Sequence, residues 1–303
     1  MSEPLAIETA GLRKTYGGVE ALRGLDLQVP AGSIHGFLGR NGAGKTTTIK
    51  IVLGMTRPTG GNTRVFGLPA EQRQSSLAIR SRAGFVSEEK DLYPYMTVEE
   101  TIRFTAAFYP GWRRDLEKRY LRSFELPVDR KVKALSKGMR TKLALLLALC
   151  RGAELLILDE PTAGLDPAVT EEVLQCLVAH VGSEEMTVFF SSHQIAEVEQ
   201  IADRVTIIDR GRTSVSGALE DFRENYRRIQ LVFGEEAPSA EKAPAFRGPG
   251  VLRVDRRSRA LTLIASGGAE QIVEEARALN AISVDITPVT LKEIFLETVR
   301  GEG

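Results

Sequence analysis

Short runs of hydrophobic residues alternate with segments of helical periodicity along most of the chain. Four consecutive aliphatic residues occupy positions 155–158, and similar runs lie at 187–191 and 205–208. Such runs are typical of strands that are buried on both faces. Helical patterns separate them at 167–181 and 194–201. Because strands that alternate with helices form parallel sheets covered on both sides, this pattern predicts an α/β fold.

Shorter strands and a glycine-rich loop precede these elements. The predicted strands, bounded by Gly or Pro, lie at 5–9, 25–29 and 34–38. The third strand runs directly into the loop, and a helix over 46–53 follows it. A short strand is predicted at 85–87, and from 97 to about 150 the pattern is mainly helical with breaks at prolines. We therefore expect a helical subdomain at about 90–150.

The pattern changes after about residue 225. We expect strands at 227–233, 251–255, 260–265 and 282–286, and helices at 269–280 and 290–299. The segment 234–250 contains three prolines and is predicted to be a loop, with room for one short helix. This order indicates a small α+β domain of βαββαβ type with an added helix. The sequence thus predicts two domains, 1–225 and 226–303.

Composition excludes several classes of protein. Lys plus Arg number 40 and Asp plus Glu number 40, so no chain-wide basic field favours nucleic acid as a partner. The two cysteines form no CxxC pair, which indicates a reduced cytosolic protein without a disulfide framework. The longest apolar run, 143–150, is far too short to span a bilayer, and the N-terminus does not resemble a secretory signal. If the protein acts at a membrane, another chain must supply the membrane part.

Residues 39–46 read Gly-Arg-Asn-Gly-Ala-Gly-Lys-Thr and match the phosphate-loop pattern G-x-x-x-x-G-K-[ST] between a strand and a helix. Glycines let backbone N–H groups surround phosphate oxygens, and the helix directs its partial positive charge at the same anion. Lys45 can reach the β- and γ-phosphates, and the Thr46 hydroxyl is a hard ligand for Mg²⁺. The residues expected to bind nucleotide here are Gly39, Asn41, Gly42, Ala43, Gly44, Lys45, Thr46 and Thr47.

Two carboxylates, Asp159 and Glu160, directly follow the buried strand at 155–158. In a parallel sheet this edge lies beside the phosphate loop. Asp159 can then hold Mg²⁺ through a water, and Glu160 can position or deprotonate the water that attacks the γ-phosphate. An acidic pair after a strand is by itself more often a helix cap or an exposed turn. The phosphate loop makes the catalytic interpretation the stronger one.

A second anion-binding helix end is predicted at Ser136, a natural N-cap for the helical run that follows it. With this feature, residues 4–225 resemble the ATP-binding-cassette (ABC) ATPases. The resemblance implies that the nucleotide is ATP. It also implies that Ser136 and Gly138, in a signature that is typically LSGGQ, bind the γ-phosphate held by a second subunit. Lys137 and Met139 depart from that signature.

The same resemblance implies roles for four further residues. Tyr16 is expected to stack on adenine, and Asp166, in a Gly-Leu-Asp sequence, matches the D-loop and is counted with the nucleotide-binding residues. Glu88 stands where the family usually has a glutamine, and its carboxylate can ligate Mg²⁺. His193 matches the histidine that senses the γ-phosphate and supports Glu160.

The length of the helical segment, the number of cassettes and the C-terminal domain indicate which branch of the family the chain resembles. The segment 88–135 is too short for the coiled coil of chromosome-structuring relatives, and a single cassette argues against the translation-factor relatives. The zinc cysteines of repair-type relatives do not occur. The small C-terminal domain and the ending at 289–297 resemble bacterial multidrug, antibiotic and sodium exporter ATPases, whose permease is a separate chain.

This resemblance implies the ATP-hydrolysing subunit of a membrane exporter, peripheral on the inner face of the cell membrane. It implies a head-to-tail pair of ATPase subunits, with an identical or an unlike second chain. Residues 88–109 are the expected contact for the permease. Two alternatives stay open at this point. One is a soluble ABC-type ATPase acting on nucleic acid or ribosomes, and the other is a non-hydrolysing regulator built on the same fold.

Overall fold

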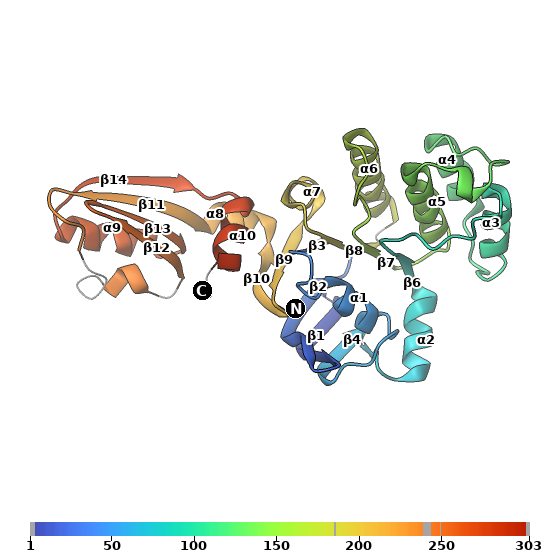
Figure 1. The fold of residues 1–303 in the computed structure, drawn as a ribbon, viewed down its shortest axis with the longest axis horizontal. Coiled ribbons are helices and arrows are strands. Elements are labelled where there is room, and N and C mark those ends of the chain that lie inside the picture. The colour runs from blue at the N-terminus through green and yellow to red at the C-terminus, as the bar shows by residue number, and fades with distance from the viewer. Residues whose placement is uncertain (1–3, 185, 239–243, 249, 301–303) are drawn as a thin grey trace. The chain divides into compact units, whose positions relative to one another are not determined.

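The computed structural model describes residues 4–184, 186–238, 244–248 and 250–300. The chain divides into two compact units, Met1–Ser216 and Gly217–Gly303 (Figure 1). The division precedes helix α8 (Leu219–Asn225), whereas the sequence predicted a boundary after residue 225. Helix α8 contacts strands β11 (Tyr226–Phe233) and β13 (Ala260–Ser266) of the second unit, which explains why the division comes earlier.

A six-stranded sheet forms the centre of the first unit. Its strands, in spatial order, are β10 (Arg212–Ala218), β9 (Arg204–Asp209), β3 (Ile34–Gly39), β8 (Thr187–Ser192), β7 (Leu155–Asp159) and β6 (Ala83–Val86). From β9 to β6 the neighbouring strands are parallel. The register places Asp159 beside Ser191 and Leu38 beside Ser192. The predicted parallel α/β sheet is confirmed, and the carboxyl ends of β3, β7 and β8 meet at one edge.

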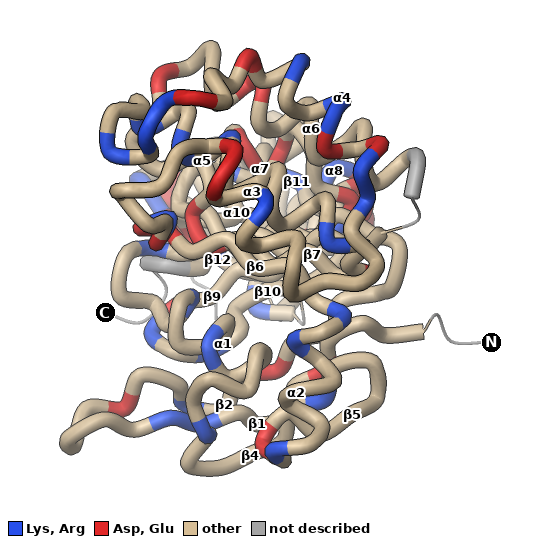
Figure 2. The backbone as a smooth tube through the Cα atoms, turned by 90° about the vertical axis from the view of Figure 1, so that its right-hand side faces the viewer, with Lys and Arg blue, Asp and Glu red and all other residues tan. Residues whose placement is uncertain are grey.

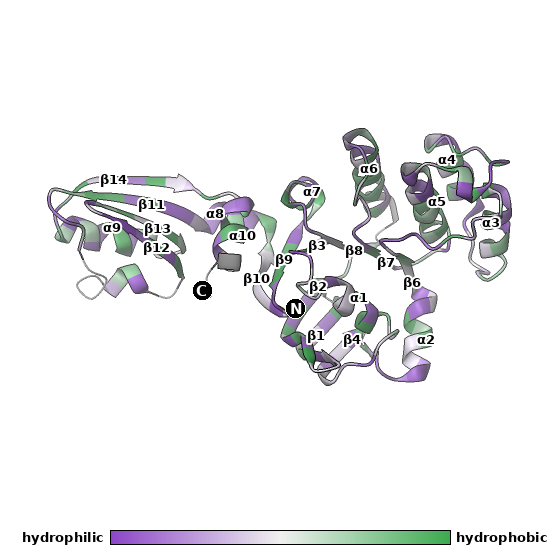
Figure 3. Cartoon of the chain, viewed as in Figure 1, coloured by the Kyte–Doolittle hydropathy of each residue, from purple (hydrophilic) through white to green (hydrophobic). Residues whose placement is uncertain are grey.

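Helices lie between the strands of this sheet along the chain. They are α1 (Lys45–Val52), α2 (Arg73–Arg82), α5 (Lys137–Leu149), α6 (Pro167–Glu184) and α7 (Ile195–Ile201). Helices α3 (Val98–Ala106) and α4 (Arg114–Ser123), with the short 3-10 helix η1 (Val132–Ala134), lie with α5 at one end of the unit (Figure 1). Thr97 and Glu100 form a capping box that starts α3. The second half of α5 is hydrophobic and buried (Figure 3), so this helix is the centre of the helical region.

A separate antiparallel sheet was not predicted. Its strands, in spatial order, are β2 (Val19–Pro30), β1 (Leu5–Tyr16), β4 (Gly60–Val65) and β5 (Leu68–Pro69). The predicted strands at 5–9 and 25–29 are parts of β1 and β2. Strand β4 starts Gly-Gly-Asn and alternates only weakly, so its hydrophobic pattern does not indicate a strand. Helix α1 packs against this sheet, which places β2 next to the phosphate loop.

The second unit is a four-stranded antiparallel sheet with helices. Its remaining elements are η2 (Pro244–Arg247), β12 (Val251–Arg257), α9 (Ala269–Ala278), β14 (Ala281–Pro288) and α10 (Leu291–Arg300). The spatial order β12-β13-β11-β14 is that of a βαββαβ fold in which the 3-10 helix η2 replaces the first helix. Its core includes Ile229, Leu231 and Phe246. Arg253 and Glu297 form an ion pair of 2.6 Å between β12 and α10.

The surface carries both signs of charge. Figure 2 shows blue and red segments interspersed along the trace, without a face of one sign in that view. None of the helices in the described part of the chain is both long and apolar enough to cross a bilayer. The interspersed charges agree with the balanced composition.

Candidate functional site

The loop between β3 and α1 forms a cradle of backbone N–H groups. Gly42 and Gly44 have φ values of 81° and 113°, in the region that favours glycine. A Cβ at Gly44 would lie 2.7 Å from the Cδ2 atom of Leu22, so a larger residue cannot fit. No side chain caps α1, which leaves the first N–H groups of the helix without intrahelical partners. This arrangement fits an anion such as a polyphosphate.

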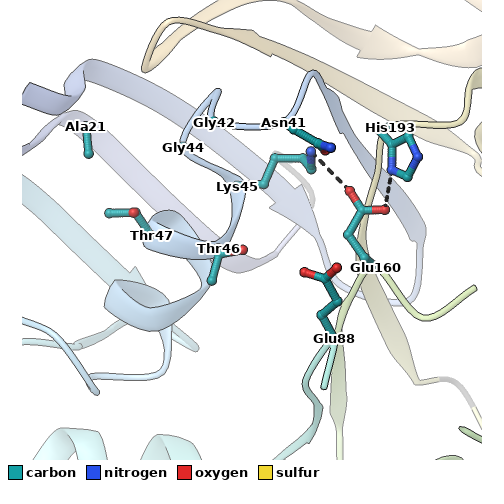
Figure 4. A pocket seen from close by; sticks show the side chains of 10 residues that line it. All are labelled: Ala21, Asn41, Gly42, Gly44, Lys45, Thr46, Thr47, Glu88, Glu160 and His193. Atoms are coloured by element: carbon teal, nitrogen blue, oxygen red, sulfur yellow. Dashed lines mark hydrogen bonds and ion pairs between the residues drawn. The ribbon is translucent and has the colours of Figure 1, made fainter. Parts of the chain in front are cut away.

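Lys45 lies across this cradle. Its ammonium is buried and donates hydrogen bonds to the carbonyl oxygens of Gly39, at 2.7 Å, and Arg40, at 3.2 Å. The same nitrogen lies 3.1 Å from Oε1 of Glu160, at the end of β7 (Figure 4). The predicted phosphate-binding lysine and the predicted catalytic carboxylate are therefore in direct contact.

The backbone at the end of β7 is held by a neighbouring strand. Oγ of Ser191 accepts a hydrogen bond from the N–H of Glu160 at 3.0 Å and donates one to Oδ1 of Asp159 at 2.7 Å. Glu160 has a φ of 46°, a conformation that non-glycine residues rarely adopt. Such outliers persist only where the surrounding contacts fix them. Ser191 is one of those contacts.

The carboxylate of Glu160 has two different oxygens. Oε2 lies 2.8 Å from Nδ1 of His193, whose side chain is partly exposed at the end of β8. Oε1 is buried and, although it lies beside the Lys45 ammonium, accepts no hydrogen bond from the described residues. The first oxygen is thus fixed by a histidine, and the second is available to a further donor.

These groups surround a pocket of about 330 Å³ (Figure 4). Its lining residues are Ala21, Asn41, Gly42, Gly44, Lys45, Thr46, Thr47, Glu88, Glu160 and His193. Nine of these ten were predicted from the sequence, and Ala21, which lies on β2, was not. The pocket joins the phosphate loop to both predicted catalytic side chains.

The other predicted site residues lie outside this lining. Asp159 is buried behind Glu160, and Tyr16 is 45% exposed with the Lys14 ammonium 4.7 Å from its ring centre. Ser136 accepts a hydrogen bond from the N–H of Met139 at 3.1 Å, as the predicted cap of α5. The remaining predicted residues outside the pocket lining are Gly39, Ala43, Gly138 and Asp166.

The comparisons with known proteins agree with this geometry. Residues 22–163 match the ABC transporter family. The daunorubicin resistance ATP-binding protein DrrA3 of Streptomyces coeruleorubidus is 32% identical over 301 residues, which are 97% of this chain and 94% of that protein. This chain belongs to the ABC transporter ATP-binding proteins. The predicted family, the α/β cassette fold and the class of ATPase are confirmed.

Two further relatives of this ABC subunit extend the comparison. The bacitracin transport ATP-binding protein BcrA of Bacillus licheniformis is 36% identical over 208 residues, which are 68% of this chain and 67% of that protein. The solved structure of cbiO1 from Clostridium perfringens, part of the ABC transporter complex cbiONQ, has a TM-score of 0.64 and 27% identity. It matches 73% of this chain and 92% of the cbiO1 chain.

Three residues of this ABC subunit that contact the site region were not predicted from its sequence. Ser191 could have been found, because it lies at the carboxyl end of a strand next to Asp159. Glu197, on α7, is buried and accepts hydrogen bonds of 2.6 Å from the hydroxyls of Thr162 and Ser192. It therefore joins the loop after β7 to the end of β8. No local pattern marks a glutamate that acts through such distant partners.

The third missed residue is Lys90, which is only 7% exposed. Its ammonium donates hydrogen bonds to the carbonyl oxygens of Glu88, at 3.0 Å, and Glu160, at 3.3 Å. Burial, followed by the nearby charge of Lys137, lowers the pKa of Lys90 to about 8, although neighbouring carboxylates oppose this shift. Lys90 thus connects the segment after β6 to the segment after β7.

Proposed function

We propose that this ABC subunit hydrolyses ATP to power export through a separate permease chain. The observation that carries the proposal is the contact of Glu160 with both Lys45 and His193 at the edge of the nucleotide-type pocket. The names of the relatives concern daunorubicin resistance and bacitracin transport, which favours export over an ATPase acting on nucleic acid. The proposed location is the inner face of the cell membrane, as a peripheral subunit.

The pocket residues fit the substrate ATP. The uncapped N–H groups of α1 and the Lys45 ammonium would bind the β- and γ-phosphates, and Tyr16 would stack on the adenine. Oε1 of Glu160, which lies beside the Lys45 ammonium and accepts no hydrogen bond from the described residues, would accept a proton from, or orient, the attacking water. His193 would hold the carboxylate in this position through Oε2.

The donor set near the phosphate loop also fits Mg²⁺. The Thr46 hydroxyl and the carboxylates of Glu88 and Asp159 are hard oxygen ligands, which Mg²⁺ prefers. Within the part of the chain that the structure describes, no group of three or more His, Cys, Asp or Glu side chains forms a metal site. This suits an ion that protein sites bind with one or two ligands together with phosphates. When bound, Mg²⁺ would neutralise charge that develops on the phosphate oxygens.

We further propose that two ATPase subunits pair head to tail. Ser136 and Gly138 lie at the start of α5 and do not line the pocket of their own chain. A helix start capped by Ser136 is suited to bind an anion. In a pair, this end of α5 and Asp166 would complete the ATP site of the partner, which is either an identical or an unlike chain.

The proposed permease contact lies on the segment that follows β6. Four aromatic side chains are exposed there, and their rings form a continuous series of contacts. They are Tyr93, Tyr95, Phe104 and Phe108. An exposed aromatic cluster is unusual for a free surface and typical of an interface. Beside it, Ser87, Lys90, Leu92, Tyr109, Ala144 and Leu147 help to line a groove of about 270 Å³, here called the α5 groove.

Mixing two inactive variants tests the paired arrangement. Ser136→Arg blocks the signature, and Lys45→Ala weakens the phosphate loop. A mixed pair has one site with both substitutions and one intact site. If half of the pairs are mixed, we expect the mixture to regain up to about a quarter of the wild-type phosphate release. Subunit exchange is shown separately with tagged chains. Pairing of wild-type with Lys45→Ala chains controls for the competence of a single intact site.

Two results would contradict these proposals. With exchange and a competent single site shown, no recovery would mean that Ser136 acts within its own chain. For the permease, the subunit is reconstituted in liposomes with the membrane protein encoded beside it, if its gene neighbourhood supplies one. ATP-dependent export that stops with Glu160→Gln is expected. ATPase stimulated by RNA or DNA, and not by that membrane protein, would instead favour the nucleic-acid alternative.

A further inference from the structure

We propose that Lys90 is a positioning residue that connects the α5 groove to the catalytic carboxylate of Glu160. The inference rests on the proposed function, because it assigns to the ATPase site a link toward the proposed permease contact. It assigns a role to a lysine outside the nucleotide pocket, the phosphate loop and the signature.

Lys90 has unusual hydrogen-bond partners for a buried lysine. A buried ammonium normally requires a carboxylate partner. The carboxylates of Glu88, Asp159 and Glu160 are near enough to influence Lys90 electrostatically. Its two hydrogen bonds nevertheless go to main-chain carbonyl oxygens, one in each of two segments. Bonds to the main chain depend on the path of the backbone, so Lys90 fixes the distance between these segments.

The backbone is in a rare conformation at both ends of this link. Lys90 has a φ of 51° and Glu160 a φ of 46°, so two non-glycine residues in the left-handed region are joined by one hydrogen bond. Such conformations cluster at functional sites, where the surroundings hold them in place. The carbonyl that Lys90 holds belongs to the residue whose carboxylate contacts Lys45 and His193.

Lys90 also lines the α5 groove, together with Ser87, Asp91 and Leu92 of the same segment. The opposite wall comes from α5, through Ala144, Leu147 and Ala148. A group that enters this groove must contact the segment that Lys90 ties to Glu160. A contiguous path of one side chain and one hydrogen bond therefore leads from the groove to the main chain of the catalytic residue.

The test uses the purified full chain with Mg²⁺ and ATP. Lys90→Met keeps most of the aliphatic stem and removes the ammonium. We expect kcat to fall about tenfold, because misplacing a catalytic group by less than 1 Å has effects of this size, while KM and ATP affinity stay within twofold. Lys90→Arg, which can still donate to carbonyls, is expected to recover at least half of the lost rate. Lys142→Met is the matched control, since Lys142 is also largely buried but pairs with Glu172 away from the pocket.

A second measurement tests the link itself. Hydrogen exchange of the peptide covering 87–92 should slow when ATP is added to the wild type, and this response should be lost in Lys90→Met. The phosphate-loop peptide covering 39–47 should be protected by ATP in both chains, which shows that binding is intact.

The possible failures are distinguishable. A wild-type chain that does not hydrolyse ATP, or whose hydrolysis survives Glu160→Gln, would contradict the proposed function. An unchanged kcat in Lys90→Met, or a fall in kcat accompanied by equal losses in affinity and melting temperature, would overturn the positioning role. An exchange response at 87–92 that is absent in the wild type or unchanged in Lys90→Met would overturn the connection to the groove.

Discussion

Buried titratable side chains differ between the interior of the six-stranded sheet, where one is held neutral, and its carboxyl edge, where one lies beside a charge. In the interior, His35 on β3 is 1% exposed and contacts the Thr206 hydroxyl at 2.9 Å beside the ring of Phe189. Burial, with a smaller effect of the Arg204 charge, lowers the pKa of His35 to about 3, so the side chain is neutral. At the edge, Glu160 is similarly buried, at 5%, but forms an ion pair with Lys45 and a hydrogen bond with His193.

This difference shows where the fold is organised for stability and where for chemistry. A neutral polar group with a partner is compatible with tight packing. Buried charges contribute little net stability, since desolvation offsets their attraction. A phosphate or a water that enters the pocket can, however, use the same charges. We therefore expect edge variants to affect catalysis more than stability, and interior variants to do the reverse.

The largest expected effect is that of Glu160→Gln. Removal of the carboxylate charge should lower kcat by about 100-fold or more, because general bases contribute effects of this size, while ATP affinity is retained. An ATP-bound pair should accumulate in size-exclusion chromatography. Phosphate release measures turnover, with Glu71→Gln as an exposed control. Turnover within threefold of the wild type would remove Glu160 from the catalytic role.

A smaller effect is expected for Lys45→Ala. Loss of the charge-assisted contacts to phosphate should weaken ATP binding by roughly 10- to 100-fold, as expected for about 1.5–3 kcal/mol. Calorimetry with Mg²⁺ measures the affinity. Lys50→Ala, on the exposed side of the same helix, is the control and should bind ATP normally. If Lys45→Ala binds like the wild type, the ammonium does not contact the phosphates.

The same comparison explains what the sequence could predict. The interior strands at 155–158 and 187–191 were found because a short, largely apolar run depends only on local composition. The phosphate loop was found because its glycines and Lys45 are contiguous. Strand β4 and helix α2 were missed, since both are mostly polar and neither shows a clear period. Their regular structure depends on tertiary contacts, which β4 makes with β1 and α2 makes with β5 and β6.

The edge could be predicted only as far as its residues follow strand ends. Glu160 and His193 follow β7 and β8 directly, and both line the pocket. Lys90 was missed because its position depends on a hydrogen bond to a carbonyl 70 residues away. Asp159 was placed correctly at the strand end, but Ser191 and not the pocket holds its oxygen. A sequence pattern locates the end of a strand. Tertiary contacts decide whether the side chain there faces the pocket or binds a neighbouring strand.

The smallest expected effect on ATP hydrolysis is that of an interior variant, whose change is in stability and depends on pH. The unfolded chain takes up a proton on His35 near pH 6.5, whereas the folded chain resists protonation until about pH 3. The unfolded state therefore binds more protons between these values, so stability from this group is complete above pH 6.5 and is lost as the pH falls. The free energy of unfolding should decrease by about 1.4 kcal/mol per pH unit relative to His35→Gln, which lacks this titration. Urea unfolding between pH 7 and pH 4.5 measures the difference. A difference between the two chains that stays constant over this range would mean that His35 is not held neutral by the fold. At pH 7 the folded variant should hydrolyse ATP like the wild type, in contrast to the variants at the edge.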